Sequence, residues 1–335
     1  MKVITDASRV DRMKWSEFVK THPQGNIFQS PEMYDVYQNT KNYEPVFISI
    51  IDDDRIEAIL LAVIQKENYG FLSFFTARSI IFGGPLIDNK KLFLLDFLLK
   101  EYIKLIEKKV VYSQIRNLII QNKIQKELFS KYGYKYENHL NILIDLTIGV
   151  SDLWKGVKRN RKDGINKAKK QGFEFRVINK LGNLNEFYIL LKELFRTIKL
   201  PYPDISFFQN LNNLLHNNIH WFLMEYQGRP CIILCALHFN GVLYAYFIGI
   251  SQDKDFQKLR PVDLFYWEVI KWGAENGMRY FDWMGAGKPE KDYGVRDFKL
   301  QYGGEVNNFG RYEKIHKSSL FNMAKIGLNI WQKIK

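Results

Sequence analysis

The chain has 335 residues, 46% of them hydrophobic and 15% aromatic, and its 49 Lys and Arg outweigh 36 Asp and Glu to give a net charge of +13. This length supplies apolar material for two domains, each with its own core. The charge favours phosphate-bearing partners such as RNA, nucleotides or anionic membrane surfaces, without deciding among them. Apolar runs too short to cross a bilayer, and an N-terminus without an apolar signal segment, exclude a membrane-spanning protein. We expect a cytoplasmic protein, soluble or peripheral at the inner membrane face.

The first half predicts two short helices, a hairpin and then β-β-α-β-α-β elements. Apolar residues recur at helical spacing up to His22, and Ser30-Pro31 predicts the start of the second helix, with Ser as its cap. Runs rich in β-branched residues at 45–52 and 55–66, joined by an Asp-rich turn, predict a hairpin. The later elements are strands at 71–75 and 80–82, a helix at 92–106, a strand at 115–120, a helix at 124–129 and a strand at 141–146.

The second half predicts a similar pattern. Ser151 is expected to cap a strongly basic helix, and Asn240-Gly241 is a two-residue hairpin turn. The remaining elements are strands at 173–178, 220–226, 231–239, 242–250 and 279–283, and helices at 186–198, 206–215 and 261–276. Both halves therefore predict a mixed sheet flanked by helices, an α/β protein with two α+β domains.

The two cysteines are expected to be reduced thiols. Cys231 and Cys235 fall within one predicted strand, where residues four apart lie too far from each other for a disulfide. No second pair of Cys or His residues accompanies them, so we predict no metal site.

A basic segment lies between Lys155 and Lys170, with eight basic residues and one acid, Asp163. On a helix, Trp154, Val157, Ile165 and Ala168 would face the protein body and leave most cations toward solvent. Such a one-sided run predicts a tRNA- or polyanion-binding surface, and a merely solvated face is the alternative. The candidate contacts are Lys155, Lys158, Arg159, Arg161 and Lys162.

A second segment combines glycines with a lysine. Gly285 and Gly287 directly follow a predicted strand, where glycines let a substrate backbone approach closely. Lys299, in the aromatic-rich stretch that follows, is our candidate to stabilise an oxyanion. The alternative is a surface lysine beside a core Phe298. The motifs of nucleotide hydrolysis, zinc proteolysis and Gly-x-Ser-x-Gly hydrolases are missing.

Several of these stretches together resemble the FemABX family, non-ribosomal peptidyltransferases that move amino acids from aminoacyl-tRNA to a peptidoglycan precursor. The residues that carry the resemblance are Gln29-Ser30, Trp154 to Gly172 with Lys158-Arg159-Asn160-Arg161, Pro261 to Gly285 with Tyr280-Phe281-Asp282, and Phe298-Lys299 with Tyr302-Gly303. The resemblance implies tandem GNAT-like domains. We expect domain 1 to span 1–147 plus about 317–335, and domain 2, with the active site, to span 148–316.

The resemblance also implies site residues. Phe298 and Lys299 match the pair beside the reacting centre, where the lysine is thought to stabilise the transferring carbonyl, and Tyr246 matches a tyrosine that contacts the acceptor. Further candidates for substrate binding are Tyr244, Asp282, Arg296 and Tyr202. Two departures leave the acceptor open. Asp204 and Phe208 stand where relatives that bind nucleotide-linked muropeptide have Arg-x-x-x-Tyr, and residues 200–203 resemble an acetyltransferase-like branch associated with polysaccharide synthesis.

The expected function is therefore aminoacyl transfer from aminoacyl-tRNA to the amine of a nucleotide- or lipid-linked peptidoglycan precursor, without a cofactor. Acetyl-CoA is disfavoured because residues 251–261, before the helix at 261–276, contain no glycine to cradle a pyrophosphate. One alternative is an acyl-CoA-dependent N-acyltransferase acting on an amino sugar or polysaccharide precursor. Another is a non-catalytic RNA- or membrane-surface binder that uses the basic segment and an amphipathic C-terminal end, which would otherwise pack on domain 1. That end contains Leu320, Phe321, Leu328, Ile330 and Trp331.

Overall fold

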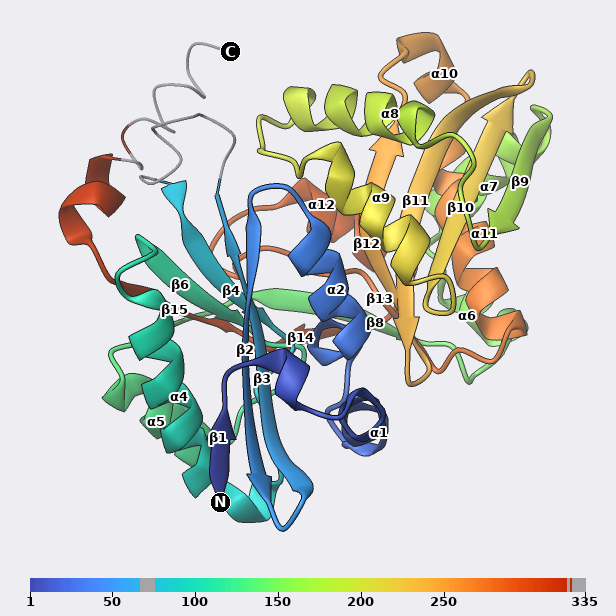
Figure 1. The fold of residues 1–335 in the computed structure, drawn as a ribbon. Coiled ribbons are helices and arrows are strands. Elements are labelled where there is room, and N and C mark those ends of the chain that lie inside the picture. Colours follow the sequence, from blue (N-terminus) through green and yellow to red (C-terminus); the bar gives the residue numbers. More distant parts are fainter. Residues whose placement is uncertain (67–75, 324–325, 327–335) are drawn as a thin grey trace. The chain divides into compact units, whose positions relative to one another are not determined.

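The computed structural model describes residues 1–66, 76–323 and 326, and the chain forms two compact units (Figure 1). The first unit is Met1–Asn138 with Phe309–Lys335, and the second is His139–Asn308. These boundaries differ from the expected ones, at 147 and 316, because the strands near both boundaries pair with the sheet of the other unit than expected. β8 (Leu140–Asp145) pairs within the second sheet, and β15 (Arg311–Ile315) pairs within the first. The expected strand at 71–75, and Leu328, Ile330 and Trp331 of the C-terminal end, lie outside the described residues.

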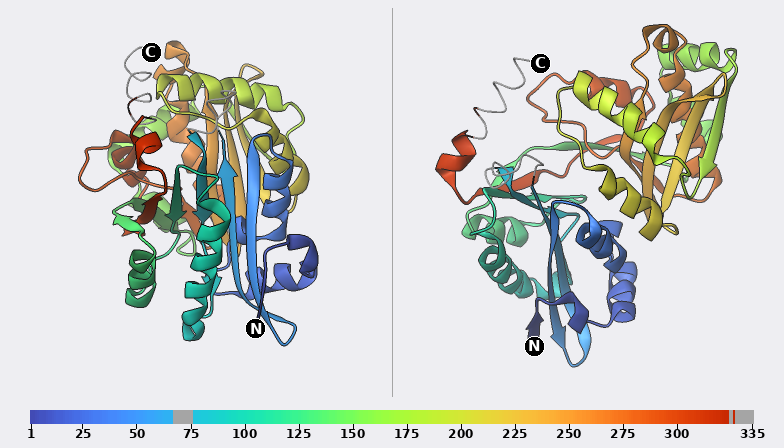
Figure 2. Two further views of the ribbon diagram at one scale, coloured as in Figure 1. Left: turned by 60° about the vertical axis from the view of Figure 1, so that its left-hand side comes forward. Right: turned by 45° about the horizontal axis from the view of Figure 1, so that its top comes forward.

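The first unit is a mixed sheet in the order β1-β2-β3-β4-β6-β15-β7, with helices on both faces (Figure 2). The expected hairpin is confirmed as β2 and β3, and the strand expected at 115–120 lies earlier, as β6. Besides β15, the strands are β1 (Lys2–Ile4), β2 (Tyr43–Asp52), β3 (Arg55–Gln65), β4 (Arg78–Phe82), β5 (Leu86–Ile87), β6 (Tyr112–Arg116) and β7 (Lys135–Glu137). The helices are α1 (Arg12–Thr21), α2 (Pro31–Asn39), α4 (Phe93–Ile106) and α5 (Lys123–Lys131).

Successive side chains along each strand point to opposite faces of this sheet, and each face packs against different helices. Ile48 and Leu60 pack in the core beneath α4, whereas the Phe47 ring lies 4.3 Å from that of Trp15 on α1. Phe321, in the described part of the C-terminal end, makes an edge contact with Tyr112 of β6 at 5.4 Å. The described start of that end therefore contacts the first unit.

Gln29, half of the Gln-Ser element, ties three segments of the first unit together. Its buried amide Nε2 donates to the carbonyls of Leu61 (2.9 Å) and Phe82 (2.8 Å), and its Oε1 accepts from the Leu61 N–H at 2.8 Å. Its own carbonyl accepts from Trp15 Nε1 at 2.8 Å. Gln29 therefore fastens the chain before α2 to β3 and β4.

Replacing Gln29 with Leu should lower the free energy of unfolding by about 2–4 kcal/mol, because it leaves the N–H and carbonyl of Leu61 and the Phe82 carbonyl without this partner. Urea unfolding at neutral pH measures the effect. The matched control is Gln38→Leu on the exposed side of α2, which should stay within about 0.5 kcal/mol of wild type. Equal stability of the two variants would contradict the role of Gln29.

The second unit is a sheet in the order β14-β8-β13-β12-β11-β10-β9, antiparallel except for the β12–β13 pair. Its strands, besides β8, are β9 (Phe173–Ile178), β10 (Ile219–Tyr226), β11 (Arg229–Phe239), β12 (Val242–Ile250), β13 (Tyr280–Asp282) and β14 (Glu305–Asn308). Its helices are α6 (Val150–Gly156), α7 (Arg159–Lys169), α8 (Leu184–Thr197), α9 (Ile205–Leu214), α10 (Lys254–Lys258), α11 (Pro261–Glu275) and α12 (Gly294–Leu300). The predicted α/β class with two mixed sheets is confirmed.

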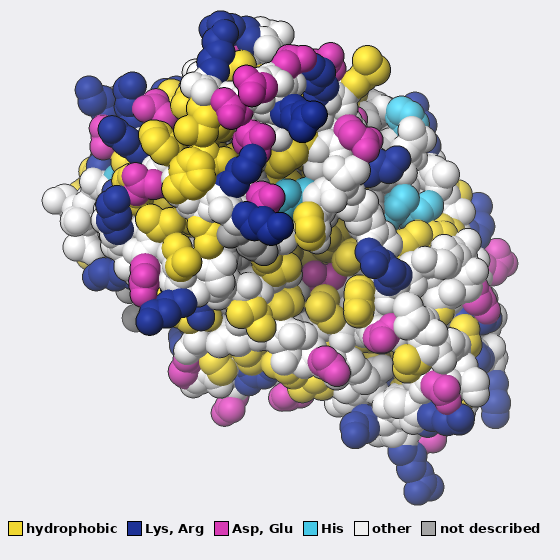
Figure 3. Space-filling model, turned by 90° about the horizontal axis from the view of Figure 1, so that it is seen from below, with side chains coloured by type: hydrophobic (Ala, Val, Ile, Leu, Met, Phe, Trp, Pro, Cys, Tyr) yellow, Lys and Arg dark blue, Asp and Glu magenta, His cyan; other side chains and the backbone are white. Residues whose placement is uncertain are grey.

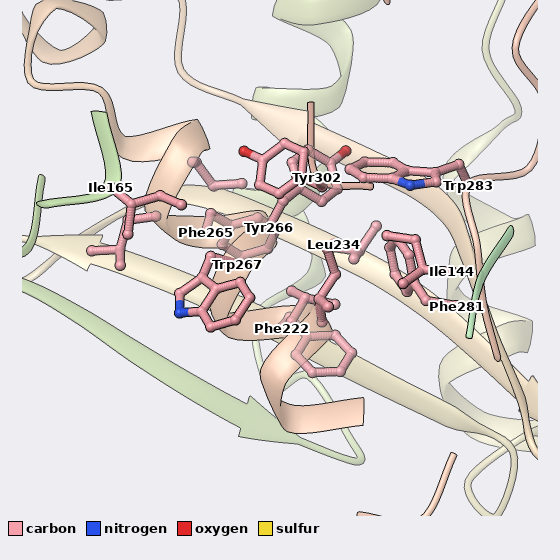
Figure 4. Packing of buried hydrophobic residues seen from close by; sticks show 14 of the residues in the cluster. Ile144, Ile165, Phe222, Leu234, Phe265, Tyr266, Trp267, Phe281, Trp283 and Tyr302 are labelled. Carbon is pink, nitrogen blue, oxygen red and sulfur yellow. The ribbon is translucent and has the colours of Figure 1, made fainter. Parts of the chain in front are cut away.

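Helices cover both faces of this second sheet. Phe222 and Leu234 pack in a core with Phe265 of α11 and Ile165 of α7, and Figure 4 shows these side chains together. On the other face, the Trp221 ring lies 5.0 Å from that of Phe187 on α8. Both cysteines are buried free thiols in β11, as expected.

The basic segment forms two helices rather than one. The first begins at Val150 after Gly149, whose φ of +83° suits glycine, so the expected Ser151 cap is wrong. Val157 and Lys158 separate α6 from α7. Val157, Ile165 and Ala168 are buried as expected, and Trp154 is half-buried.

Candidate active site

The parallel strands β12 and β13 separate soon after they meet. They pair only over Val242–Tyr244 and Tyr280–Asp282, and a register shift opposite Cys235 and Ala236 leaves Tyr246 as an extra residue in β12. Such a bulge bends a strand and increases its twist. Beyond it, Ala245 to Ile248 are all half-buried, which indicates that β12 is incompletely covered there. The open end of a parallel strand pair is where α/β sheets commonly bind ligands.

The turn after β13 is held by two buried side chains, Asp282 and Asn141. Asp282 Oδ1 accepts from the Met284 N–H at 2.7 Å and from Asn141 Nδ2 at 2.8 Å. Asn141 Oδ1 accepts from the Gly285 N–H at 2.9 Å. Met284 has a φ of +56°, which is unfavourable for a residue with a side chain, whereas Gly285 adopts its φ of +115° freely; the bonds to this turn therefore stabilise the conformation of Met284. Asn141 was missed in the sequence, because nothing in its neighbourhood links it to a turn so distant along the chain.

Lys299 reaches this turn from α12. Its Nζ donates to the Trp283 carbonyl at 3.0 Å and to the Gly285 carbonyl at 2.5 Å. Burial lowers the pKa of Lys299 to about 8, and the charge of Asp282 opposes that shift. Burial raises the pKa of Asp282 to about 6, opposed by the Met284 N–H, Asn141 and Lys299. Lys299 is therefore no ordinary surface lysine, and at neutral pH it holds a largely desolvated positive charge.

Aromatic rings surround the Lys299 segment. The half-buried Phe298 ring lies 5.4 Å from Tyr302 and 5.9 Å from Tyr266 of α11. Tyr266 and Trp283 are 4.5 Å apart, and Figure 4 shows the rings of Tyr266, Tyr302 and Trp283 grouped at one end of the core. Lys299 Nζ lies 5.6 Å from the Trp283 ring centroid, within cation–π range. The Trp283 ring therefore covers part of the lysine side chain.

Arg161 is buried, and this corrects its expected place among the solvent-facing cations. Its Nη1 is paired with Asp263, its Nη2 donates to Gln301 Oε1 at 2.7 Å, and its guanidinium lies 4.3 Å from the Phe298 ring centroid. Asp263 also accepts from Arg260 Nε at 2.7 Å. Because α7 crosses closely over α11, Arg161 is turned toward Asp263 and away from solvent. A phosphate of a bound polymer would have to displace a buried ion pair to reach it.

A hollow of about 330 Å³ lies at the N-terminus of α11. It is lined by Arg161, Gln257, Arg260, Pro261, Val262, Asp263 and Phe298. A pyrophosphate cradle at a helix N-terminus relies on free backbone N–H groups. Here Pro261 has no N–H, and the Asp263 carboxylate already lies in the first turn.

The other members of the expected polyanion surface differ in their exposure and in their partners. Lys158 and Arg159 are exposed, while Lys155 pairs with Asp152 at 2.6 Å. Lys162 donates to the Lys155 carbonyl at 3.2 Å and lies over the Trp154 ring. On the face of the molecule drawn in Figure 3, Lys and Arg alternate with Asp and Glu instead of forming one continuous basic surface.

The remaining expected residues fall into two groups. Tyr244 is buried and pairs with Asp282 across β12 and β13, and burial raises the pKa of its hydroxyl far above the usual range. Tyr246 is half-buried, with its ring 4.8 Å from Phe247 and 6.2 Å from Phe207. These tyrosines lie on the strand beside the Lys299 turn.

Tyr202 and Arg296 have packing and bonding partners of their own. Tyr202 packs edge-on against Tyr188 and Phe195, at 6.0 and 6.1 Å. Arg296 donates to the carbonyls of Lys288 (2.9 Å) and Lys291 (2.8 Å), and so orders the loop before α12. In the described parts of the chain, no His, Cys, Asp and Glu side chains gather in threes to hold a metal, and no helix is long and apolar enough to cross a bilayer.

Replacing Gly164 with Ala should destabilise the protein by about 1–3 kcal/mol, because a Cβ there would lie 2.0 Å from Asp263 Oδ2 and 3.1 Å from Arg260 Nε. Thermal unfolding measures the loss. Gly156→Ala in α6 is the matched control, since its Cβ would meet nothing within 4 Å, and it should be neutral or slightly stabilising. A Gly164→Ala protein as stable as the control would show that α7 and α11 are not in close contact.

Comparison with known proteins agrees with this description. Residues 155–299 match the family model described as Acetyltransferase (GNAT) domain. No curated protein matches the chain. Among solved structures, FemX is 14% identical and similar over 96% of this chain and 99% of its own, with a TM-score of 0.72.

Two further structures share the arrangement. A tandem GNAT protein from the clavulanic acid biosynthesis pathway is 8% identical, with a TM-score of 0.59 over 94% of this chain and 98% of its own. L-PGS from Bacillus licheniformis is 14% identical, with a TM-score of 0.57 over 92% of each chain. The chain therefore has the two-domain fold of these structures, and residues 155–299 of it match a GNAT domain model.

Proposed function

We propose that the second unit transfers an aminoacyl group from aminoacyl-tRNA to the amine of a peptidoglycan precursor. The observation that carries the proposal is the desolvated ammonium of Lys299 beside the open end of the β12–β13 pair. The FemABX resemblance of Phe298 and Lys299 supports it, because the chain also has the FemX fold. The GNAT match over residues 155–299 supports acyl transfer as the class of reaction.

In the proposed reaction the acceptor amine attacks the ester carbonyl of the aminoacyl-tRNA. A C–N bond forms, the ester C–O bond breaks, and the amine proton passes through water or a substrate group to the departing ribose oxygen. Negative charge develops on the carbonyl oxygen, and the Lys299 ammonium would stabilise it in a site of low dielectric. Holding the two substrates together would supply a further part of the rate.

Two features of the second unit support aminoacyl-tRNA as the donor: the N-terminus of α11 and the exposed cations of the basic segment. In the first turn of α11, Pro261 offers no N–H and Asp263 adds a negative charge, and these two features support a donor other than acetyl-CoA. Lys158 and Arg159 remain exposed on the basic segment and would attract the tRNA backbone. Tyr246, at the bulge in β12, would contact the acceptor. Tyr244, Asp282, Arg296 and Tyr202 act indirectly in this proposal, by shaping the strand pair, the turn and the loop.

The experiment that tests this function is incubation with charged tRNA and a panel of nucleotide- and lipid-linked muropeptide precursors, followed by mass spectrometry. Covalent addition of an amino acid to a precursor amine supports the proposal. Transfer from acetyl-CoA but not from charged tRNA would assign the acyl-CoA alternative instead. Salt-sensitive RNA binding with no transfer to any amine would assign the non-catalytic binder.

Replacing Lys299 with Met should lower kcat by about 10²–10³-fold with little change in KM, because the lost charge acts on the transition state. Single-turnover transfer measures this effect. Lys291→Met, an exposed lysine in the loop before α12, is the matched control and should retain wild-type kcat. An unchanged kcat for Lys299→Met rules out the oxyanion role.

The pH dependence of kcat follows from the two shifted groups. Lys299 must be protonated to act, so kcat should fall as pH rises through about 8, and it should fall again below about 6 as Asp282 is protonated. Because the Asp282 charge raises the pKa of Lys299, Asp282→Asn should move the alkaline limb to lower pH. An alkaline limb at the same pH in both proteins would show that Asp282 does not act on the lysine.

Reversing charge in Lys158→Glu/Arg159→Glu should raise the Kd for tRNA about tenfold or more and reduce its salt dependence. Filter binding across a salt series measures both. Lys254→Glu/Lys271→Glu makes the same change in net charge elsewhere in the second unit and should have a smaller effect. Equal losses in the two double variants would show that net charge, and not this surface, governs binding.

A further inference from the structure

A second hollow lies on the first unit, between α4, the end of α5 and β15. Its volume is about 510 Å³. Its lining holds four lysines against one acid: the residues are Lys100, Ile103, Lys104, Glu107, Lys131, Tyr132, Gly133 and Lys314. The proposed transfer reaction uses none of these residues.

Two of the four lysines make close ion pairs with a carboxylate. Lys131 pairs with Asp96 at 2.6 Å and Lys104 with Glu101 at 3.5 Å. Lys100 and Lys314 have no carboxylate within 4.0 Å among the residues that the structure describes. Burial lowers the pKa of Lys314, and the charge of Glu107, which lines the same hollow, opposes that shift. An anionic group in the hollow would meet these two amines at reduced dielectric.

The same helix face carries two exposed aromatic rings. Phe93 is 54% exposed and Phe97 is 46% exposed, although the opposite face of α4 is buried in the core. Phe93, Phe97, Lys100 and Lys104 follow one another at i, i+4, i+7 and i+11, a spacing that places them in one row along the helix. Figure 1 shows α4 beside α5 on the outside of this unit.

We propose that this row on α4 and the adjoining hollow dock the first unit onto anionic phospholipid. Phe93 and Phe97 enter the boundary between headgroups and acyl chains, and Lys100, Lys104 and Lys314 contact lipid phosphates. Aromatic rings with neighbouring lysines are typical of interfacial helices, and juxtamembrane lysines are attracted to anionic leaflets. RNA would account for the lysines alone, whereas a lipid surface accounts for both the lysines and the rings.

The test is flotation of the full chain with vesicles of phosphatidylcholine alone and of phosphatidylcholine with 30% phosphatidylglycerol. We expect binding to the anionic vesicles only, weakened by salt. Phe93→Ser/Phe97→Ser and Lys100→Glu/Lys104→Glu should each reduce binding on the order of tenfold or more. Two matched controls change residues outside the row on α4. One removes exposed apolar side chains (Ile189→Ser/Ile198→Ser) and the other reverses charge (Lys123→Glu/Lys254→Glu), and both should bind the anionic vesicles as the wild type does.

Three results would overturn the proposal. They are failure to bind anionic vesicles, binding that neither test pair weakens, and lysine-dependent binding of a transfer RNA in place of vesicles. The last result would assign the hollow and the row on α4 to nucleic-acid binding. Circular dichroism verifies folding of each variant, and the single substitutions Phe93→Ser and Lys100→Glu serve if a double variant does not fold. Vesicle binding is read without any transfer activity, so this test stands or fails separately from the proposed reaction.

Discussion

The site of the second unit depends on one constraint, the hydrogen-bonded turn after β13, which Asp282 and Asn141 hold and to which Lys299 donates. Asp282 accepts hydrogen bonds from Asn141 and from the Met284 N–H. These bonds fix the turn that contains Gly285 and the strained Met284. That turn presents the Trp283 and Gly285 carbonyls, which receive the lysine. Without the carboxylate, a desolvated ammonium held only by carbonyl dipoles would favour its neutral form more strongly.

Two departures from regular sheet structure shape the strand pair beside this turn. The bulge at Tyr246 and the early end of the β12–β13 pairing separate the strands just beyond Tyr244 and Asp282. Next to this strand pair, the rings of Tyr266, Trp283, Phe298 and Tyr302 pack against one another. The buried Arg161–Asp263 pair, at the crossing of α7 and α11, supports the Phe298 side of the same region.

Much of this architecture could be predicted from periodicity and turn chemistry. The β2–β3 hairpin follows from two β-rich runs joined by an Asp-rich turn, and the free thiols of β11 follow from the spacing of two cysteines within one strand. The unit boundaries could not be predicted, because long-range pairing decides whether β8 and β15 belong to one sheet or the other. The sequence places Arg161 among the solvated cations of the basic segment. Its inward position depends on the close approach of α7 to Asp263 of α11 at Gly164, which has no local sequence signal. Asn141 and the bulge at Tyr246 leave no local pattern in the sequence.

The most direct measurement of the central claim is the pKa of Lys299 itself, from the pH titration of its side-chain carbon resonance by NMR, assigned by its disappearance in Lys299→Met. The account predicts titration near pH 8 in the wild-type protein and at lower pH in Asp282→Asn. Titration near the ordinary value of about 10.4 in both proteins would show a solvated lysine uncoupled from Asp282, and would contradict the account.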